Sequence, residues 1–275
     1  MSTVLHSAVR TVRFRGANLF NCEKGLKTET ASERSKFDAA DRTRFIEAVD
    51  EYEYVNCVIR YAKHVEPAFL TMLKNYYDKA AQAEFVDNFQ GTYIALHKTR
   101  RAGQYCVLYF DLTRVSLQNT NSDVMERVRE GLTAFCRRYG VSNWNPKSDR
   151  YPTPQCMLGE FERALSGTAA WRDEKIYVIV NACDQNDKEY PRPEELDRYR
   201  ESCYVLRLFF GYLKSCREQG HLFCQVLVAE NPGFLADCVN DRFSVYIDFT
   251  DIALRIFGME SSHEWLPVFS GRKLS

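Results

Sequence analysis

Short apolar runs alternate along this chain with stretches in which apolar residues recur every three or four positions. Each run has the length of one strand and is bordered by polar or turn-forming residues, which is typical of a strand buried on both faces. Five runs have this form: Val55–Arg60, Tyr105–Leu112, Lys175–Asn181, Leu222–Ala229 and Phe243–Phe249. Because helical patterns fall between them, they predict an α/β fold with a mostly parallel five-stranded sheet covered on both faces.

The amphipathic stretches between the runs predict helices. In Asp123–Tyr139, for example, Val124, Val128 and Leu132 recur every four residues and so lie on one helix face. The other predicted helices are Ala68–Asp78, Cys156–Leu165, Glu194–Gln219 and Asp251–Phe257. The segment Asn143–Gln155 holds three prolines and is interpreted as a surface loop. We therefore expect an irregular N-terminal arm over residues 1–40 and one domain over residues 41–275.

The most informative stretch lies between the first run and the helix after it. From Arg60 to Pro67 the sequence reads RYAKHVEP, so a strand, a sharp break and a helix follow one another. That order is the setting of a phosphate-binding P-loop, G-x-x-x-x-G-K-[ST]. Counted back from the helix, Val65, Glu66 and Pro67 stand where the second Gly, the Lys and the Ser/Thr belong. The frame of a P-loop is present, but the residues that would hold phosphate are replaced.

These replacements oppose phosphate binding for physical reasons. A P-loop needs Gly where its backbone turns through positive φ, and the β-branched Val65 tolerates such angles poorly. Glu66 reverses the charge of the Lys, and a unit charge at about 4 Å is worth roughly 4 kcal/mol at an effective dielectric near 20. Pro67 offers neither a hydroxyl group for Mg²⁺ nor a backbone N–H. The same residues suit a helix start, because proline is favoured in the first turn and a carboxylate there interacts well with the helix dipole.

Several segments, in order, resemble the motifs of one known family. Asp41–Ile46 (DRTRFI) resembles a D-K-T-x-F-I motif, and Cys57–Arg60 with Phe69–Leu73 resembles the strand and helix that flank an R-P-R-R-F-G-K-S loop. Val107–Leu112 (VLYFDL) resembles a V-L-x-L-D-F strand, and Ile176–Asp184 resembles a Walker B strand that ends in D-E-Y-D. Together these segments are similar to the AAA-ATPase-like family of P-loop domains, over residues 10–260 or so.

The resemblance implies a P-loop NTPase-like three-layer sandwich, with Walker A after the first strand and Walker B on the third. These two strands should be adjacent or separated by one strand. The positions that the resemblance assigns to a degenerate nucleotide site are Arg60, Lys63, Val65, Glu66, Pro67, Asn181, Ala182 and Asp184. In that comparison Asn181 replaces the Asp that organises the metal ion, and Ala182 replaces the Glu that activates water. Asp184 remains from the acidic set.

The changes in both motifs favour a catalytically inactive pseudo-ATPase that acts as a binding or regulatory module. We expect no catalytic residues, no metal site and no cofactor, and we expect a protein partner, for which an active relative is one candidate. The first alternative is a nucleotide-binding protein or weak ATPase that uses Lys63 and Asp184 with ATP and Mg²⁺. The second alternative is a nucleic-acid-associated protein, because relatives can be joined to nucleases.

The charge balance bears on these alternatives. Lys and Arg number 37, as do Asp and Glu, so the formal net charge is zero. No global field therefore draws the protein to nucleic acid or to a membrane surface, and neither partner is expected. The local basic run Lys98–Arg101 is interpreted as a solvated loop rather than a binding patch.

The cysteines indicate the cellular compartment. There are ten, they are scattered, and several, such as Cys57, Cys106 and Cys224, fall inside apolar runs. Without a C-x-x-C pair or a secretory signal, buried thiols in a reducing compartment are expected, and zinc is not. No apolar run is long enough to span a bilayer. We expect an intracellular protein of the cytoplasm or nucleus, while the acid-free, Arg-containing first 22 residues keep mitochondrial import as an option.

Overall fold

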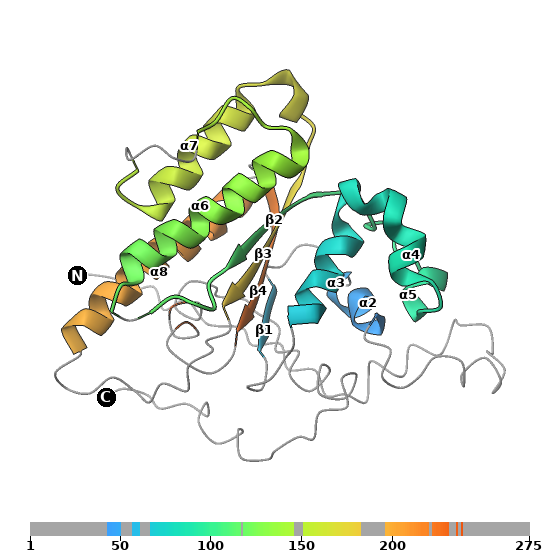
Figure 1. Ribbon diagram of the computed structural model, residues 1–275, viewed down its shortest axis with the longest axis horizontal. Coiled ribbons are helices and arrows are strands. Elements are labelled where there is room, and N and C mark those ends of the chain that lie inside the picture. The colour runs from blue at the N-terminus through green and yellow to red at the C-terminus, as the bar shows by residue number, and fades with distance from the viewer. Residues whose placement is uncertain are drawn as a thin grey trace, which may run out of the picture.

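The computed structural model describes residues 43–50, 57–60, 67–116, 118–145, 151–182, 196–219 and 222–230, together with residues 235 and 238. The four strands of these ranges are β1 (Cys57–Arg60), β2 (Cys106–Asp111), β3 (Ile176–Ala182) and β4 (Phe223–Glu230). They form one sheet in the order β1-β4-β3-β2, and all neighbours are parallel (Figure 1).

This arrangement confirms the predicted α/β class and the parallel sheet. Four of the five predicted strands are present within a few residues of the expected bounds, and the fifth run, Phe243–Phe249, lies outside the described residues. The first and third strands are separated by one strand, β4, as the sequence predicted. The N-terminal arm, residues 1–40, also lies outside the described part of the chain.

Helices fill the connections between the strands. The described helices are α2 (Arg44–Asp50), α3 (Pro67–Tyr77), the 3-10 helix η2 (Lys79–Glu84), α4 (Phe85–Phe89), α5 (Tyr93–Leu96), α6 (Thr120–Tyr139), α7 (Pro154–Ser166), the 3-10 helix η3 (Ala169–Trp171) and α8 (Leu196–Glu218). Helices α3, α6, α7 and α8 confirm four predicted helices, and the fifth, Asp251–Phe257, lies outside the described residues. The short helices α4 and α5 were not predicted.

The start of α7 corrects the predicted loop Asn143–Gln155. The helix begins at Pro154, two residues before the expected start at Cys156. Thr153 precedes it in an extended conformation, and its hydroxyl oxygen accepts a hydrogen bond from the backbone N–H of Cys156 at 3.2 Å. A threonine cap followed by proline in the first turn is a favoured helix start, which explains why this proline belongs to the helix.

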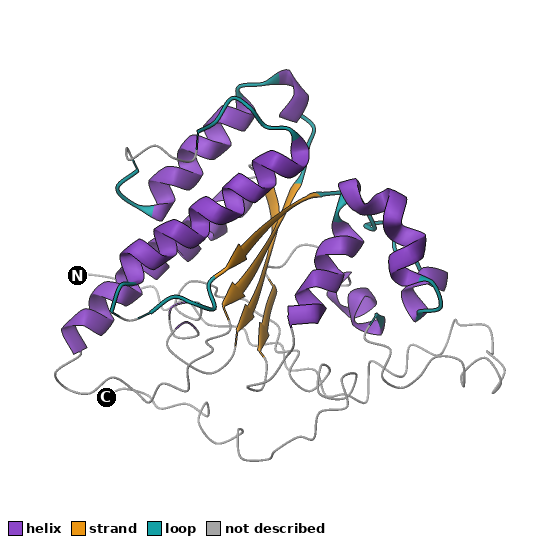
Figure 2. Cartoon of the chain, in the orientation of Figure 1, coloured by secondary structure: helices purple, strands orange, loops and turns teal. Residues whose placement is uncertain are grey.

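Helices cover both faces of the sheet, so the described chain forms three layers (Figure 2). Side chains alternate along each strand, and they divide between two buried clusters. Val107, Ile179 and Leu227 belong to the cluster that includes residues of α2, α3, α4 and α5. Leu108 and Val180 belong to the cluster that includes residues of α6, α7 and α8. Each fully buried aliphatic or aromatic side chain contributes about 1.5–3 kcal/mol, so these two faces supply most of the stabilisation.

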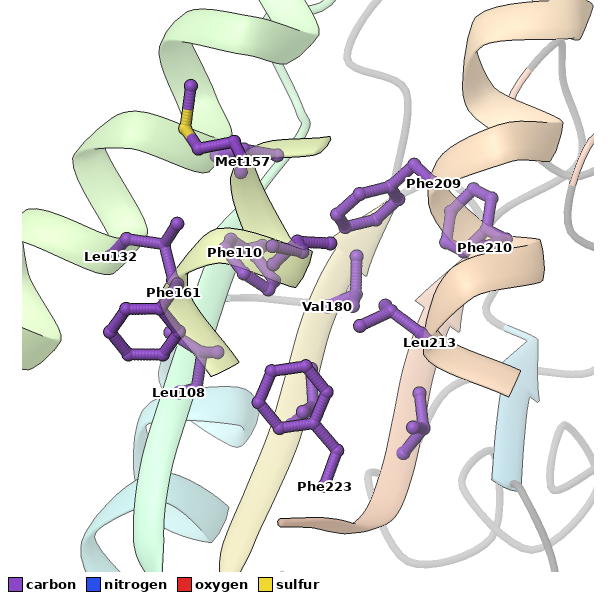
Figure 3. Packing of buried hydrophobic residues seen from close by; sticks show 14 of the residues in the cluster. Leu108, Phe110, Leu132, Met157, Phe161, Val180, Phe209, Phe210, Leu213 and Phe223 are labelled. Atoms are coloured by element: carbon purple, nitrogen blue, oxygen red, sulfur yellow. The ribbon is translucent and has the colours of Figure 1, made fainter. Parts of the chain in front are cut away.

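The larger cluster joins three helices to the strands, as Figure 3 shows. Leu132 of α6, Phe161 of α7 and Phe209 of α8 lie around Phe110 of β2. The rings of Phe110 and Phe209 meet edge to face, with their centroids 5.4 Å apart, which is the arrangement that aromatic pairs prefer. This contact connects α8, the longest of the described helices, to β2, which lies at one end of the described strand order.

Close packing of α6 on β2 depends on a glycine. A Cβ atom at Gly131 would lie 2.6 Å from the backbone oxygen of Tyr109, which is closer than side chains approach backbone. The helix then ends at Gly140, whose φ of 70° is the left-handed conformation that terminates many helices. None of the helices in the described ranges is long and apolar enough to cross a membrane.

The basic run Lys98–Arg101 differs from its predicted role as a solvated loop. Lys98 and Arg100 are exposed, but the side chain of Arg101 is only 5% exposed. Its guanidinium group donates to the hydroxyl oxygen of Tyr105 at 2.9 Å and to the side-chain oxygen of Gln225 at 2.5 Å. One partner is close in sequence and the other lies 124 positions away, and together they hold the last arginine of this run in a buried position.

Candidate functional site

The carboxyl ends of β1 and β3 lie level with each other at one edge of the sheet. Arg60, the last residue of β1, pairs with Glu230 of β4, and Glu230 pairs on its other side with Ala182, the last residue of β3. Since neighbouring strands are about 4.8 Å apart, the two strand ends are separated by about 10 Å. All four strands point to this edge (Figure 1).

The connections make this edge a favourable place for a ligand. The helix that follows β1 along the chain is α3, which packs on one face of the sheet, whereas α8 follows β3 and packs on the other. In open α/β sheets, ligands bind outside the carboxyl ends of strands at the point where successive connections leave on opposite faces. The fold thus brings the ends of β1 and β3, where four of the predicted site residues lie, to the kind of place where ligands bind in such sheets.

The structure places half of the predicted site residues. Arg60 ends β1, Pro67 begins α3, and Asn181 and Ala182 end β3. The other predicted residues lie outside the described ranges: Lys63, Val65, Glu66 and Asp184. The start of α3 at Pro67 agrees with the interpretation of this proline as a first-turn residue.

Asn181 belongs to the face of the sheet that α3 covers. It follows Tyr177 and Ile179 at two-residue spacing, and both of these pack in the cluster that contains Leu70 and Leu73 of α3. Asn181 is 6% exposed, and its backbone oxygen accepts a hydrogen bond from the N–H of Leu112 at 2.8 Å. A neutral amide therefore lies near the carboxyl end of β3, at the position where the resemblance leads us to expect a metal-organising carboxylate.

Ala182 belongs to the opposite face. It is fully buried and packs in the cluster formed with α6, α7 and α8. A glutamate at this point would have to direct its carboxylate out of an apolar environment, because an unpaired buried charge costs several kcal/mol. The methyl group of alanine fits the surroundings without that cost.

Asp111 is a further residue of this edge that the sequence analysis did not assign to the site. It ends β2 and pairs directly with Asn181 of β3, so both residues belong to the same face. Its side chain is exposed, and Oδ1 accepts a hydrogen bond from the N–H of Thr113 at 3.1 Å. An acidic residue near the end of an apolar run was the available signal, because the carboxyl ends of parallel strands lie together.

A basic side chain of α3 lies on the same face. The ammonium nitrogen of Lys74 is 5.8 Å from the ring centroid of Tyr109, which precedes Asp111 by two residues on β2. This cation–π contact holds Lys74 against the sheet, in the last turn of α3 and far from its first turn. Within the described ranges, no group of three or more His, Cys, Asp or Glu side chains is arranged to hold a metal ion.

The loop after β2 is fixed by its own hydrogen bonds. The backbone N–H and the hydroxyl group of Ser116 both donate to Oδ2 of Asp123 at 2.8 Å. The hydroxyl oxygens of Thr120 and Ser202 lie 2.7 Å apart and join α6 to α8. These contacts connect the described part of the loop after β2 to α6, and α6 to α8.

Comparison with known proteins supports the resemblance to the AAA-ATPase-like family. A family model named AAA-ATPase_like, with the description Predicted AAA-ATPase, matches residues 34–229, which is more than half of the chain. The matched range includes the loop after β1 and the ends of β2 and β3. No curated protein matches the chain. The chain therefore belongs to the predicted AAA-ATPase-like family.

Proposed function

We propose that this chain keeps the frame of an AAA-ATPase-like domain but does not hydrolyse ATP, and that it acts as a binding or regulatory module. One observation carries the proposal. At the end of β3, level with the end of β1, Asn181 and Ala182 stand at the positions where the resemblance expects two carboxylates. Neither side chain can be ionised, and both are buried.

Loss of these carboxylates removes two separate contributions to hydrolysis. The Asp of a Walker B strand organises Mg²⁺, which bridges and neutralises the phosphates in phosphoryl transfer. The Glu activates the attacking water, and a general base is typically worth 10²–10⁴-fold in rate. Because Asn181 and Ala182 supply neither function, we expect no measurable hydrolysis by this site.

The sequence of the loop between β1 and α3 also supports the proposal. Val65, Glu66 and Pro67 replace the glycine, the cation and the hydroxyl group that hold phosphate. Glu66 and Pro67 suit a helix start, and α3 does begin at Pro67. The loop is therefore better suited to begin a helix than to hold an anion.

The remaining parts of the proposal rest on the resemblance to the family. We infer that Phe243–Phe249 supplies a fifth strand, that neither ATP nor Mg²⁺ is a resident cofactor, and that the partner is a protein, with an active relative as one candidate. An intracellular location in the cytoplasm or nucleus fits the cysteines. No two of those whose side chains the structure describes form a disulfide bond with each other.

A second candidate function is weak nucleotide binding. Asp111 favours it, because this exposed carboxylate lies beside Asn181 on the face that α3 covers. Together with Lys63 and Asp184, it would provide one cation and two carboxylates near the phosphates. Mg²⁺ in nucleotide sites is often held by one or two carboxylates and the phosphates themselves.

Restoring the motifs in steps tests the proposal. The triple variant Val65→Gly, Glu66→Lys and Pro67→Ser restores the turn, the cation and the metal hydroxyl. It should therefore bind ATP more tightly than the unaltered chain. Hydrolysis should stay undetectable until Asn181→Asp and Ala182→Glu are added. The measurements are equilibrium binding and release of inorganic phosphate.

The control is Glu84→Lys, which makes the same change of charge on an exposed residue of η2. It should leave ATP binding unchanged. Hydrolysis by the unaltered chain would refute the proposal. Equal effects of the triple variant and the control would show that the loop is not a degenerate phosphate site.

A further inference from the structure

Helix α2 is attached through polar side chains on one of its faces. The hydroxyl oxygen of Thr43, just before the helix, accepts a hydrogen bond from the backbone N–H of Ile94 at 3.1 Å. One turn later, Glu47 accepts from the hydroxyl group of Tyr93 at 2.9 Å. Asp50 follows at the end of the helix. Residues spaced by four and then three positions share a helix face, so these three side chains form one polar stripe.

The last member of the stripe enters a cluster of donors. The carboxylate of Asp50 accepts hydrogen bonds from the hydroxyl groups of Tyr77, at 2.7 Å, and of Thr99. The guanidinium group of Arg101 lies 3.4 Å from the same carboxylate. The donors come from α3 and from the segment before β2, so other parts of the fold form the carboxylate-binding position that Asp50 occupies.

Two apolar side chains also attach α2, among those of the helix that the structure describes. Ile46 and Val49 are buried in the cluster on this face of the sheet. The helix has seven residues, and isolated helices of that length are not stable in water. Among the side chains of α2 that the structure describes, Ile46, Val49 and the polar stripe attach the helix to the rest of the fold. Segments with few buried apolar contacts are the ones that open locally, before global unfolding.

We propose that α2 is a detachable strap, which opens as one unit while the sheet and the other helices remain folded. Opening would separate Asp50 from Tyr77, Thr99 and Arg101 and so present donors suited to a carboxylate. The chain runs from Asp50 to Cys57, the first residue of β1, so the strap lies directly before the strand that leads to the candidate site. This conformational device goes beyond the proposed function and does not depend on it.

Native-state hydrogen exchange of the full chain tests the proposal. The amides of Ile46–Asp50 and that of Ile94 should share one protection factor, at least about tenfold below that of the β3 amides. The variant Thr43→Val keeps the side-chain shape but removes the acceptor for Ile94. It should lower the shared protection factor several-fold and leave β3 unchanged. The matched control is Thr133→Val on α6, where the hydroxyl group bonds only within its own helix, to Arg129.

The control should leave the exchange of α2 unchanged. Equal protection of α2 and β3 in the unaltered chain would overturn the proposal. So would protection that declines residue by residue along α2, because that pattern indicates fraying rather than opening as a unit. If Thr43→Val fails to fold, the comparison of α2 with β3 in the unaltered chain still decides the question.

Discussion

The hydroxyl group of Tyr139 joins three elements at the amino edge of the sheet. It accepts a hydrogen bond from the backbone N–H of Val107 in β2 at 2.7 Å and donates to the carboxylate of Asp78 at 2.7 Å. Asp78 follows α3, is fully buried, and also accepts from Arg138 at 2.5 Å. Burial raises the pKa of Tyr139, so its hydroxyl group stays protonated and able to donate near neutral pH.

Replacing Tyr139 by Phe removes one oxygen atom and both hydrogen bonds. The N–H of Val107 then has no acceptor at a buried position, which costs about 1–3 kcal/mol. Asp78 loses one donor but keeps Arg138 and the N–H of Ala80, so its additional cost is at the low end of the range for hydrogen bonds to charged groups, about 1.5 kcal/mol. We expect Tyr139→Phe to lower the free energy of unfolding by about 2.5–4.5 kcal/mol.

Urea unfolding followed by circular dichroism measures this change. The matched control is Tyr204→Phe on α8, because Tyr204 is 62% exposed and water can replace any partner of its hydroxyl group. The control should change the stability by less than about 0.5 kcal/mol. A loss below about 1 kcal/mol in Tyr139→Phe, or a loss equal to that of the control, would refute the reasoning.

Three further predictions concern packing, thiols and pH. Gly131→Ala should destabilise the protein by about 1–3 kcal/mol in the same assay, because its Cβ atom would meet a backbone oxygen of β2 at 2.6 Å. Gly159→Ala is the control: its Cβ atom would lie 3.5 Å from the nearest neighbour, so the change should be neutral or slightly stabilising. Under denaturing, non-reducing conditions, close to ten thiols should titrate. In the native state, the exposed Cys156 should react with a thiol reagent far faster than the buried Cys106, because burial raises the pKa of Cys106 to about 12. Burial also raises the pKa of Asp50. Its contribution to stability should therefore be greatest below about pH 4 and be lost as pH rises through the folded-state pKa. If Asp50→Asn leaves the dependence of stability on pH unchanged, this reasoning is contradicted.

Local periodicity predicted the elements that are long and regular. Helices α6 and α8 carry apolar stripes over twenty residues or more, and the strands are continuous apolar runs, so their sequences determine their type. Helices α4 and α5 have only five and four residues, which is too short for a stripe to be recognised. Their helical state depends on neighbouring helices, and such contacts are not visible in the local pattern.

Features that depend on distant residues could not be predicted from local sequence. Arg101 is buried because Asp50 and Gln225, which lie 51 and 124 positions away, supply its partners. The direct pairing of Asp111 with Asn181 likewise depends on the order and register of the strands. The two motif positions at the end of β3 were found from family resemblance, whereas the fully buried setting of Ala182 required the structure.

A titration of the unaltered chain with a fluorescent ATP analogue, with and without Mg²⁺, tests the central claim most directly. A site without the loop cation and without the β3 carboxylate should bind no more tightly than about millimolar, which corresponds to about −4 kcal/mol, and Mg²⁺ should not improve it. Micromolar binding that requires Mg²⁺ would contradict the account and would favour a nucleotide site built from Lys63, Asp184 and Asp111.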